Sequence, residues 1–232
     1  MTALFGGAIG TICITKGLFY VNFASLSAVI MMQKLQPIFA IFLAWLILKE
    51  KLPKKFFLYA IIALLGAYLI AFPTLIPNFN TGNKTAIGAL FGLLAALSWG
   101  ASTVFSKRAL LETNFRVGTY LRYGLTSLIV FLMIMVSGGH IQITSVSQTQ
   151  WWYFVAIILT SGVSAMLLYY LGLKHTKASV STICELGLPI SSLIFEWFIY
   201  HKTLNLTQFI GVAILLIAII MVSRMKEATT EQ

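Results

Sequence analysis

Two ionisable side chains lie in the interior of long apolar stretches, where water does not readily solvate them. Glu185 lies about seven residues into the stretch Ala178–Tyr200, roughly 10 Å from its start at the rise of a helix. Lys34 lies near the middle of Ala24–Leu48, with Gln33 and Gln36 beside it. In such a setting a carboxyl group could carry a proton or bind a polar ligand, and a lysine could attract an anion.

The polar residues near Glu185 share one face of the expected helix. The residues on this face are spaced three or four apart, and they are Ser181, Glu185, Pro189, Ser192 and Glu196. A polar face on an apolar helix indicates a cavity, because lipid would leave these groups without partners. Two interpretations of Glu185 stay open, namely a group that binds protons or substrate and a structural residue that bonds two helices. Pro189 and Pro37 each remove a backbone N–H and are predicted hinges.

Lys34 could pair with Glu185 or act separately. If both prolines mark the same depth, the two charges lie about 10 Å apart along the helix axes. A direct salt bridge does not span this distance without extended side chains and kinked helices. A direct pair and two separate contacts within one cavity therefore both stay open. In a direct pair, Lys34 balances the charge of Glu185. As a separate contact, it attracts an anionic group of a substrate.

Other residues are expected to surround the same cavity. They are Trp99, Ser102, Thr103, Ser106, Tyr120 and Tyr123. Lys16 and Arg122 lie within about a turn of helix ends, so we expect them to extend to the membrane surface. Gly88 and Gly92 form a small-residue pair that favours close helix packing.

The elements that must position these residues are membrane-spanning helices. Of 232 residues, 59% are hydrophobic and 9% charged, which excludes an ordinary soluble domain. The apolar residues come in blocks long enough to cross a bilayer. Eight spans are predicted: Ala3–Phe19, Ala24–Leu48, Phe56–Pro77, Ala86–Ser106, Val117–Val136, Trp151–Leu171, Ala178–Tyr200 and Leu206–Ser223.

The basic residues between the spans predict the orientation. Twelve Lys and Arg residues fall on one side of the predicted membrane and two on the other. Both termini are therefore expected in the cytoplasm. The net charge of +10 follows from this pattern and does not indicate nucleic acid.

An internal repeat relates the second and seventh spans. Without a gap, Pro37 aligns with Pro189 and Trp45 with Trp197. Because the two spans cross the membrane in opposite directions, the repeat is inverted. Inverted repeats with a site at the midplane are typical of secondary transporters.

The repeat resembles the EamA repeat of the drug/metabolite transporter superfamily. In the first copy the resemblance rests on Leu35-Gln36-Pro37 to Leu48-Lys49-Glu50-Lys51-Leu52 and then Ile61 to Ala71. In the second copy it rests on Gly187-Leu188-Pro189 to Tyr200-His201-Lys202-Thr203-Leu204 and then Gly211 to Val222. Lys202 stands where the family usually has Glu. The resemblance implies an all-α polytopic membrane protein with ten helices in two inverted sets of five.

This chain shows three helices plus five. We expect an incomplete first repeat at residues 1–77 and a second repeat at 86–232, with the first two helices missing. Either the sequence is truncated or it is a natural short form.

The resemblance implies a secondary active transporter of the inner membrane. Its substrate would be a small metabolite or amphipathic organic compound, exported in exchange for protons. The alternative is a membrane remnant without transport activity, or an assembly subunit. Expected partners are the lipid bilayer, the substrate and protons, and association into a homodimer stays open.

The motifs of common enzyme classes are missing from the sequence. It has no His-Glu-x-x-His motif, no phosphate-binding Gly loop and no Asp. The three histidines are too dispersed to propose as metal ligands, and Cys13 and Cys184 lie in apolar blocks that do not indicate a disulfide. We therefore expect no enzyme activity, no metal and no cofactor.

Overall fold

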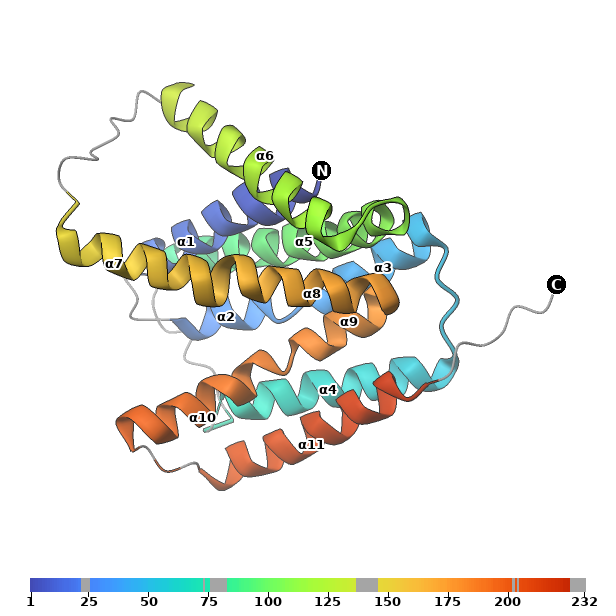
Figure 1. The fold of residues 1–232 in the computed structure, drawn as a ribbon. Coiled ribbons are helices and arrows are strands. Elements are labelled where there is room, and N and C mark those ends of the chain that lie inside the picture. Colours follow the sequence, from blue (N-terminus) through green and yellow to red (C-terminus); the bar gives the residue numbers. More distant parts are fainter. Residues whose placement is uncertain are drawn as a thin grey trace.

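The described part of the chain is built of helices (Figure 1). The computed structural model describes residues 1–21, 26–72, 74–75, 83–136, 146–201, 203 and 205–225, without the side chains of Leu26, Ser27, Asn83, Ser192, Glu196 and Tyr200. The elements are η1 (Ala3–Ile9), α1 (Gly10–Tyr20), α2 (Leu26–Gln33), α3 (Gln36–Leu48), α4 (Lys54–Ala71), α5 (Asn83–Glu112), α6 (Phe115–Val136), α7 (Gln148–Ile157), η3 (Ile158–Gly162), α8 (Val163–His175), α9 (Ala178–Glu185), α10 (Leu188–Tyr200) and α11 (Leu206–Ser223). The segments η1 and η3 are π-helical and continue into the α-helices that follow them.

Eight helical segments within the described residues are long and apolar enough to cross a membrane. They coincide with the eight predicted spans and confirm the all-α polytopic fold. Two ends differ from the prediction. The third span ends at Ala71, and the expected end Pro77 lies outside the described residues.

The fourth span is longer than predicted and continues past Ser106 to Glu112. The charged residues after Ser106 had suggested a helix end. In the structure the Lys107 Nζ donates hydrogen bonds to the carbonyls of Leu173 (3.0 Å) and Lys174 (2.8 Å). The Lys107 ammonium therefore binds the C-terminal end of α8, where carbonyls without a helical partner favour a cation. The helix α5 continues past this contact.

The inverted repeat is visible in the helix bounds. The helices α2 and α9 have 8 residues each, α3 and α10 have 13, and α4 and α11 have 18. After α3 and α10 the chain turns at Lys49 and His201, which both have positive φ angles, 53° and 49°. The predicted repeat is thus confirmed as two copies of one arrangement, a short helix, a longer helix and a closing helix.

Small residues hold the helices close together. A Cβ atom at Gly92 of α5 would lie 2.5 Å from the Val29 carbonyl oxygen of α2, and one at Gly88 would lie 3.1 Å from the Gly17 carbonyl oxygen of α1. The predicted close packing at Gly88 and Gly92 is therefore confirmed. The helices α4 and α11 lie side by side (Figure 1), and a Cβ atom at Gly66 would lie 2.8 Å from the Leu215 nitrogen.

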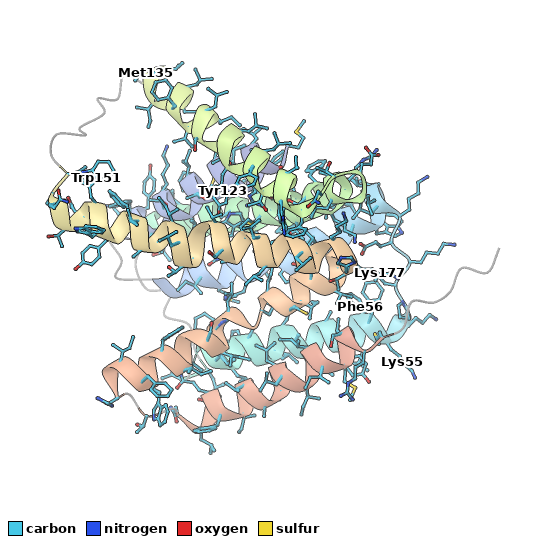
Figure 2. All side chains as sticks on the ribbon, in the orientation of Figure 1. Lys55, Phe56, Tyr123, Met135, Trp151 and Lys177 are labelled. Carbon is cyan, nitrogen blue, oxygen red and sulfur yellow. The ribbon has the colours of Figure 1, made fainter. Side chains whose placement is uncertain are left out.

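The two ends of the helix bundle differ in character. Figure 2 shows Lys55 and Lys177 at one end and Met135 and Trp151 at the opposite end. We call the first the basic end and define it by Lys55, Lys107 and Lys177. It is the end at which the loop after α3 meets the start of α9, because Lys177 Nζ lies 3.4 Å from the Lys51 carbonyl oxygen.

Candidate functional site

Both repeats contain a helix that is broken near the middle of the bundle. The first breaks between α2 and α3 at residues 34–35, and the second between α9 and α10 at 186–187. At the breaks the backbone bonds tighten to three-residue turns, with Leu35 N–H donating to the Met32 carbonyl and Leu186 N–H to the Ile183 carbonyl. The predicted hinges Pro37 and Pro189 each lie in the first turn of the helix that follows, a position that accepts proline.

Glu185 connects the two breaks. It is the last residue of α9, and its side chain is half-buried. Tyr169 Oη of α8 donates to Glu185 Oε1 at 2.6 Å, and Gln36 Nε2, at the start of α3, donates to Glu185 Oε2 at 2.6 Å. Hydrogen bonds to a carboxylate are among the stronger ones in proteins. This carboxyl group therefore bonds the two repeats together at their centre.

A cavity of about 750 Å³ surrounds this centre. Five of the predicted site residues line it, namely Gln33, Gln36, Trp99, Ser181 and Glu185. Ser102 and Thr103, also expected there, line it as well. The Trp99 Nε1 donates to the Gly6 carbonyl oxygen at 3.2 Å, which fixes the indole against η1. Mixed aromatic and polar lining in a cavity of this size is typical of small-molecule sites.

Two predicted site residues lie outside the cavity lining, and a third has no described side chain. Lys34 is in the turn between α2 and α3, and Tyr123 is on α6, but neither lines the cavity. The side chain of Ser192 lies outside the described residues, as does that of Glu196. A direct Lys34–Glu185 pair is not among the contacts of the described residues, and the two carboxylate oxygens are bonded by Gln36 and Tyr169 instead.

The cavity also contains residues that the sequence did not place there. Tyr169 and Ser161 line it from α8 and η3, and Arg122 lines it from α6. Ser161 and Tyr169 are eight residues apart and share a helix face, so the spacing was a usable signal. Arg122 was expected to extend to the membrane surface from near the helix end. That expectation is wrong, because its side chain lines the cavity instead.

A carboxylate of the first repeat caps a helix of the second at the basic end. Glu50 Oε1 accepts a hydrogen bond from Ala178 N–H (2.8 Å), and Glu50 Oε2 accepts from the N–H (3.2 Å) and Oγ (2.5 Å) of Ser179. Ala178 and Ser179 are the first two residues of α9 and are fully buried. Lys177 occupies the N-cap position of α9, but its side chain makes no capping hydrogen bond. The Glu50 carboxylate provides the cap instead.

A second cavity of about 700 Å³ lies between α3 and α4. It is lined mainly by apolar side chains, among them Ile38, Phe42, Trp45 and Phe57. It has no convergent polar groups like those around Glu185, so the first cavity is the candidate site.

Inverted repeats, broken helices and a central polar cavity together define the class of polytopic membrane transporters. A family comparison agrees with this class. The EamA-like transporter family matches residues 1–72 and 86–224. The chain belongs to this family.

Individual relatives are similar over most of the chain. The riboflavin transporter ImpX of Fusobacterium nucleatum is 44% identical over 96% of this chain and 75% of its own length. An uncharacterized transporter of Synechocystis is 25% identical over 88% of this chain and 60% of its own length. A protein crystal structure with a TM-score of 0.73 and 15% identity covers 99% of this chain and 77% of that chain, which shows the fold alone.

Proposed function

We propose that this protein transports a small amphipathic organic compound across the membrane, with riboflavin as the first substrate to test. The observation that carries the proposal is the central cavity at the junction of two broken helices, one from each inverted repeat. The choice of riboflavin rests on the 44% identity with the riboflavin transporter ImpX.

The lining of the cavity suits such a compound. Its volume lies in the usual range for sites that take molecules of drug size. Trp99 offers an aromatic face to a planar ring system. Gln33, Ser102 and Ser161 offer hydrogen bonds to a hydroxyl-rich chain such as the ribityl group of riboflavin.

Alternating access would use the contacts at the basic end. Glu50 bonds the start of α9 there, and Ala44, Val104 and Ala178 form a small apolar cluster beside it. These contacts favour a state that is closed at the basic end. In the opposite state they would separate while the two repeats move around the cavity.

Glu185 is the proposed proton-binding group. Protonation makes one of its oxygens an O–H donor, so the bond from the Gln36 amide N–H would be lost, or the bond from the Tyr169 hydroxyl would be lost or reversed. Because Gln36 belongs to the first repeat and Tyr169 to the second, proton binding would alter the connection between the repeats. The structural alternative is that Glu185 stays ionised and only holds the helices together.

Flux measurements in vesicles separate these alternatives. The full chain is reconstituted, and riboflavin flux is followed by fluorescence with and without an imposed pH gradient. We expect the gradient to change the flux of the wild type and of a Glu112→Gln control at the exposed end of α5, but not that of Glu185→Gln. A gradient effect that persists in Glu185→Gln would contradict the role of Glu185.

The same vesicles report the direction of transport. The family resemblance favours export, which would appear as gradient-driven loss of preloaded riboflavin. Riboflavin binding without flux in either direction would favour the alternative of a chain without transport activity. We further propose that the protein resides in the cell membrane with both termini in the cytoplasm, which reporter fusions at the C-terminus test.

A further inference from the structure

One cation lines the central cavity, among the residues that the structure describes, and it forms no direct ion pair with an acidic side chain there. Arg122 lies on α6, next to Tyr123, which Figure 2 labels. Its Nη1 donates one hydrogen bond, to Tyr170 Oη at 3.2 Å, and its Cζ lies 5.7 Å from the centre of that ring. The carboxylate that lines the same cavity, Glu185, has both oxygens bonded by other side chains.

The surroundings of Arg122 hold its guanidinium in place. Tyr170 is 2% exposed, and its Oη also lies 2.8 Å from Ser106 Oγ, which connects α8 to α5. On the other side, a Cβ atom at Gly6 would lie 2.6 Å from Arg122 Nη2, so a glycine at this position leaves the space that the guanidinium needs. The group is therefore positioned by three neighbouring segments before any ligand binds.

A guanidinium in this position has unused hydrogen-bonding capacity. It carries five N–H donors in a planar fork, and the described part of the protein uses one of them. A charged group inside a membrane-spanning segment is costly unless it faces a cavity and finds a partner there. Tyr170 supplies a neutral hydrogen-bond partner, and Glu185 acts on the guanidinium through its charge without a hydrogen bond, so the remaining donors are suited to a ligand in the cavity.

The chemistry of the fork indicates what this ligand presents. Arginine forms paired hydrogen bonds with two neighbouring acceptors, such as the carbonyl oxygen and bare ring nitrogen on one edge of guanine. The flavin ring system has two edges of the same kind, each with a carbonyl oxygen beside an unprotonated ring nitrogen. A lysine, which acts as a point charge, would not match this edge equally well.

We propose that Arg122 is the residue that recognises the ring of the substrate, by paired hydrogen bonds to a carbonyl oxygen and the adjacent ring nitrogen. The inference rests on the proposed function and adds the substrate edge and the residue that selects it. It also gives α6, whose predicted site residue Tyr123 does not line the cavity, a direct part in binding.

The test is riboflavin binding to the purified full chain, measured by quenching of flavin fluorescence. We expect Arg122→Gln to weaken binding roughly 10- to 100-fold, the usual range for bonds to a charged donor. Arg122→Lys should retain part of the affinity. The matched control is Arg116→Gln. Arg116 is also on α6, and its Cζ lies 5.7 Å from the centre of the Phe115 ring, but it does not line the cavity. This control should leave binding unchanged.

Two further comparisons separate recognition from packing. Tyr170→Phe removes the hydrogen bond to Arg122 but leaves the charge of Arg122 in place, and we expect the riboflavin affinity to change a few-fold at most. A loss of affinity as large as that of Arg122→Gln would indicate that Arg122 acts through packing and not through recognition. In the wild type, either 1-deazariboflavin or 5-deazariboflavin, which each lack one ring nitrogen, should bind several-fold more weakly than riboflavin. This ligand comparison stands even if an arginine variant does not fold.

The outcomes distinguish the inference from the proposed function. Wild-type binding with an unchanged affinity in Arg122→Gln, or equal affinity for riboflavin and both analogues, would overturn the recognition role and leave riboflavin as substrate. A folded wild-type protein that does not bind riboflavin would overturn the proposed substrate and the recognition of its ring together.

Discussion

Glu50 provides the sharpest test of how the two repeats move. The substitution Glu50→Gln keeps the size of the side chain but removes its charge and one of its two acceptor oxygens. The structure assigns those oxygens three hydrogen bonds, from the backbone of Ala178 and from the backbone and hydroxyl of Ser179. Because both residues are fully buried, a donor that loses Glu50 has no ready access to water.

The size of the effect follows from these contacts. A helix N-terminal cap contributes about 1 kcal/mol, and a negative charge at a helix N-terminus adds about 0.3–1 kcal/mol. A hydrogen bond to a charged group contributes about 1.5–3 kcal/mol. Since glutamine keeps one acceptor, we expect Glu50→Gln to weaken the contact by about 2 kcal/mol. If the contact exists only in the state closed at the basic end, the equilibrium shifts about 30-fold toward the state open at that end.

The thiol of Cys184 reports this shift, because it lines the cavity beside Glu185. In a Cys13→Ser background, a membrane-impermeant thiol reagent is applied to oriented vesicles from each side. We expect Glu50→Gln to increase labelling from the basic end by about an order of magnitude and to decrease labelling from the opposite end. Glu112→Gln is the control, because Glu112 is an exposed acidic residue at the end of α5. Equal labelling of the wild type and Glu50→Gln from both sides would refute this reasoning.

Two more substitutions test the site and the packing. Lys34 does not line the cavity itself but follows Gln33, which does, so its charge would act on a ligand from a short distance. Lys34→Met should therefore weaken binding of an anionic flavin, flavin mononucleotide, by at most about fivefold more than binding of neutral riboflavin, which corresponds to about 1 kcal/mol. Equal losses in the binding titration would indicate a structural lysine. Gly66→Ala places a Cβ atom 2.8 Å from the Leu215 backbone nitrogen and should destabilise the protein by about 1–3 kcal/mol in thermal unfolding. Gly172→Ala is the matched control, because a Cβ atom at this position would have no neighbour within 4 Å. A melting temperature lowered equally by both substitutions would exclude the close α4–α11 contact as the cause.

The spans and the repeat could be predicted because their signals lie along the chain. A block of apolar residues indicates a membrane helix whatever its neighbours in the fold are, so six of the eight described spans end within four residues of the prediction. The paired prolines Pro37 and Pro189 likewise marked the two broken helices. The predicted end of α5 was wrong because the charge of Lys107 suggested a helix terminus. In the structure this side chain donates hydrogen bonds to carbonyls of α8, and α5 continues.

The partners of the site residues could not be predicted in the same way. Gln36 and Glu185 are 149 residues apart in sequence and bond at 2.6 Å. Which residue of α3 faces Glu185 depends on how α3 and α9 are rotated and displaced relative to each other. A rotation of one residue, about 100°, would bring a different side chain to that place. The sequence suggested Lys34 as a possible partner of Glu185, whereas the placed helices bring Gln36 to it.

The sequence by itself determined the all-helical membrane fold, the inverted repeat and the depth of Glu185, because hydrophobicity and periodicity are properties of the chain alone. The tertiary structure decided which polar groups meet: Gln36 and Tyr169 at Glu185, Glu50 at the start of α9, and Arg122 in the cavity and not at the membrane surface. The physical reason is that each of these contacts joins helices that are distant in sequence, and small residues such as Gly92 and Gly66 set how closely such helices approach.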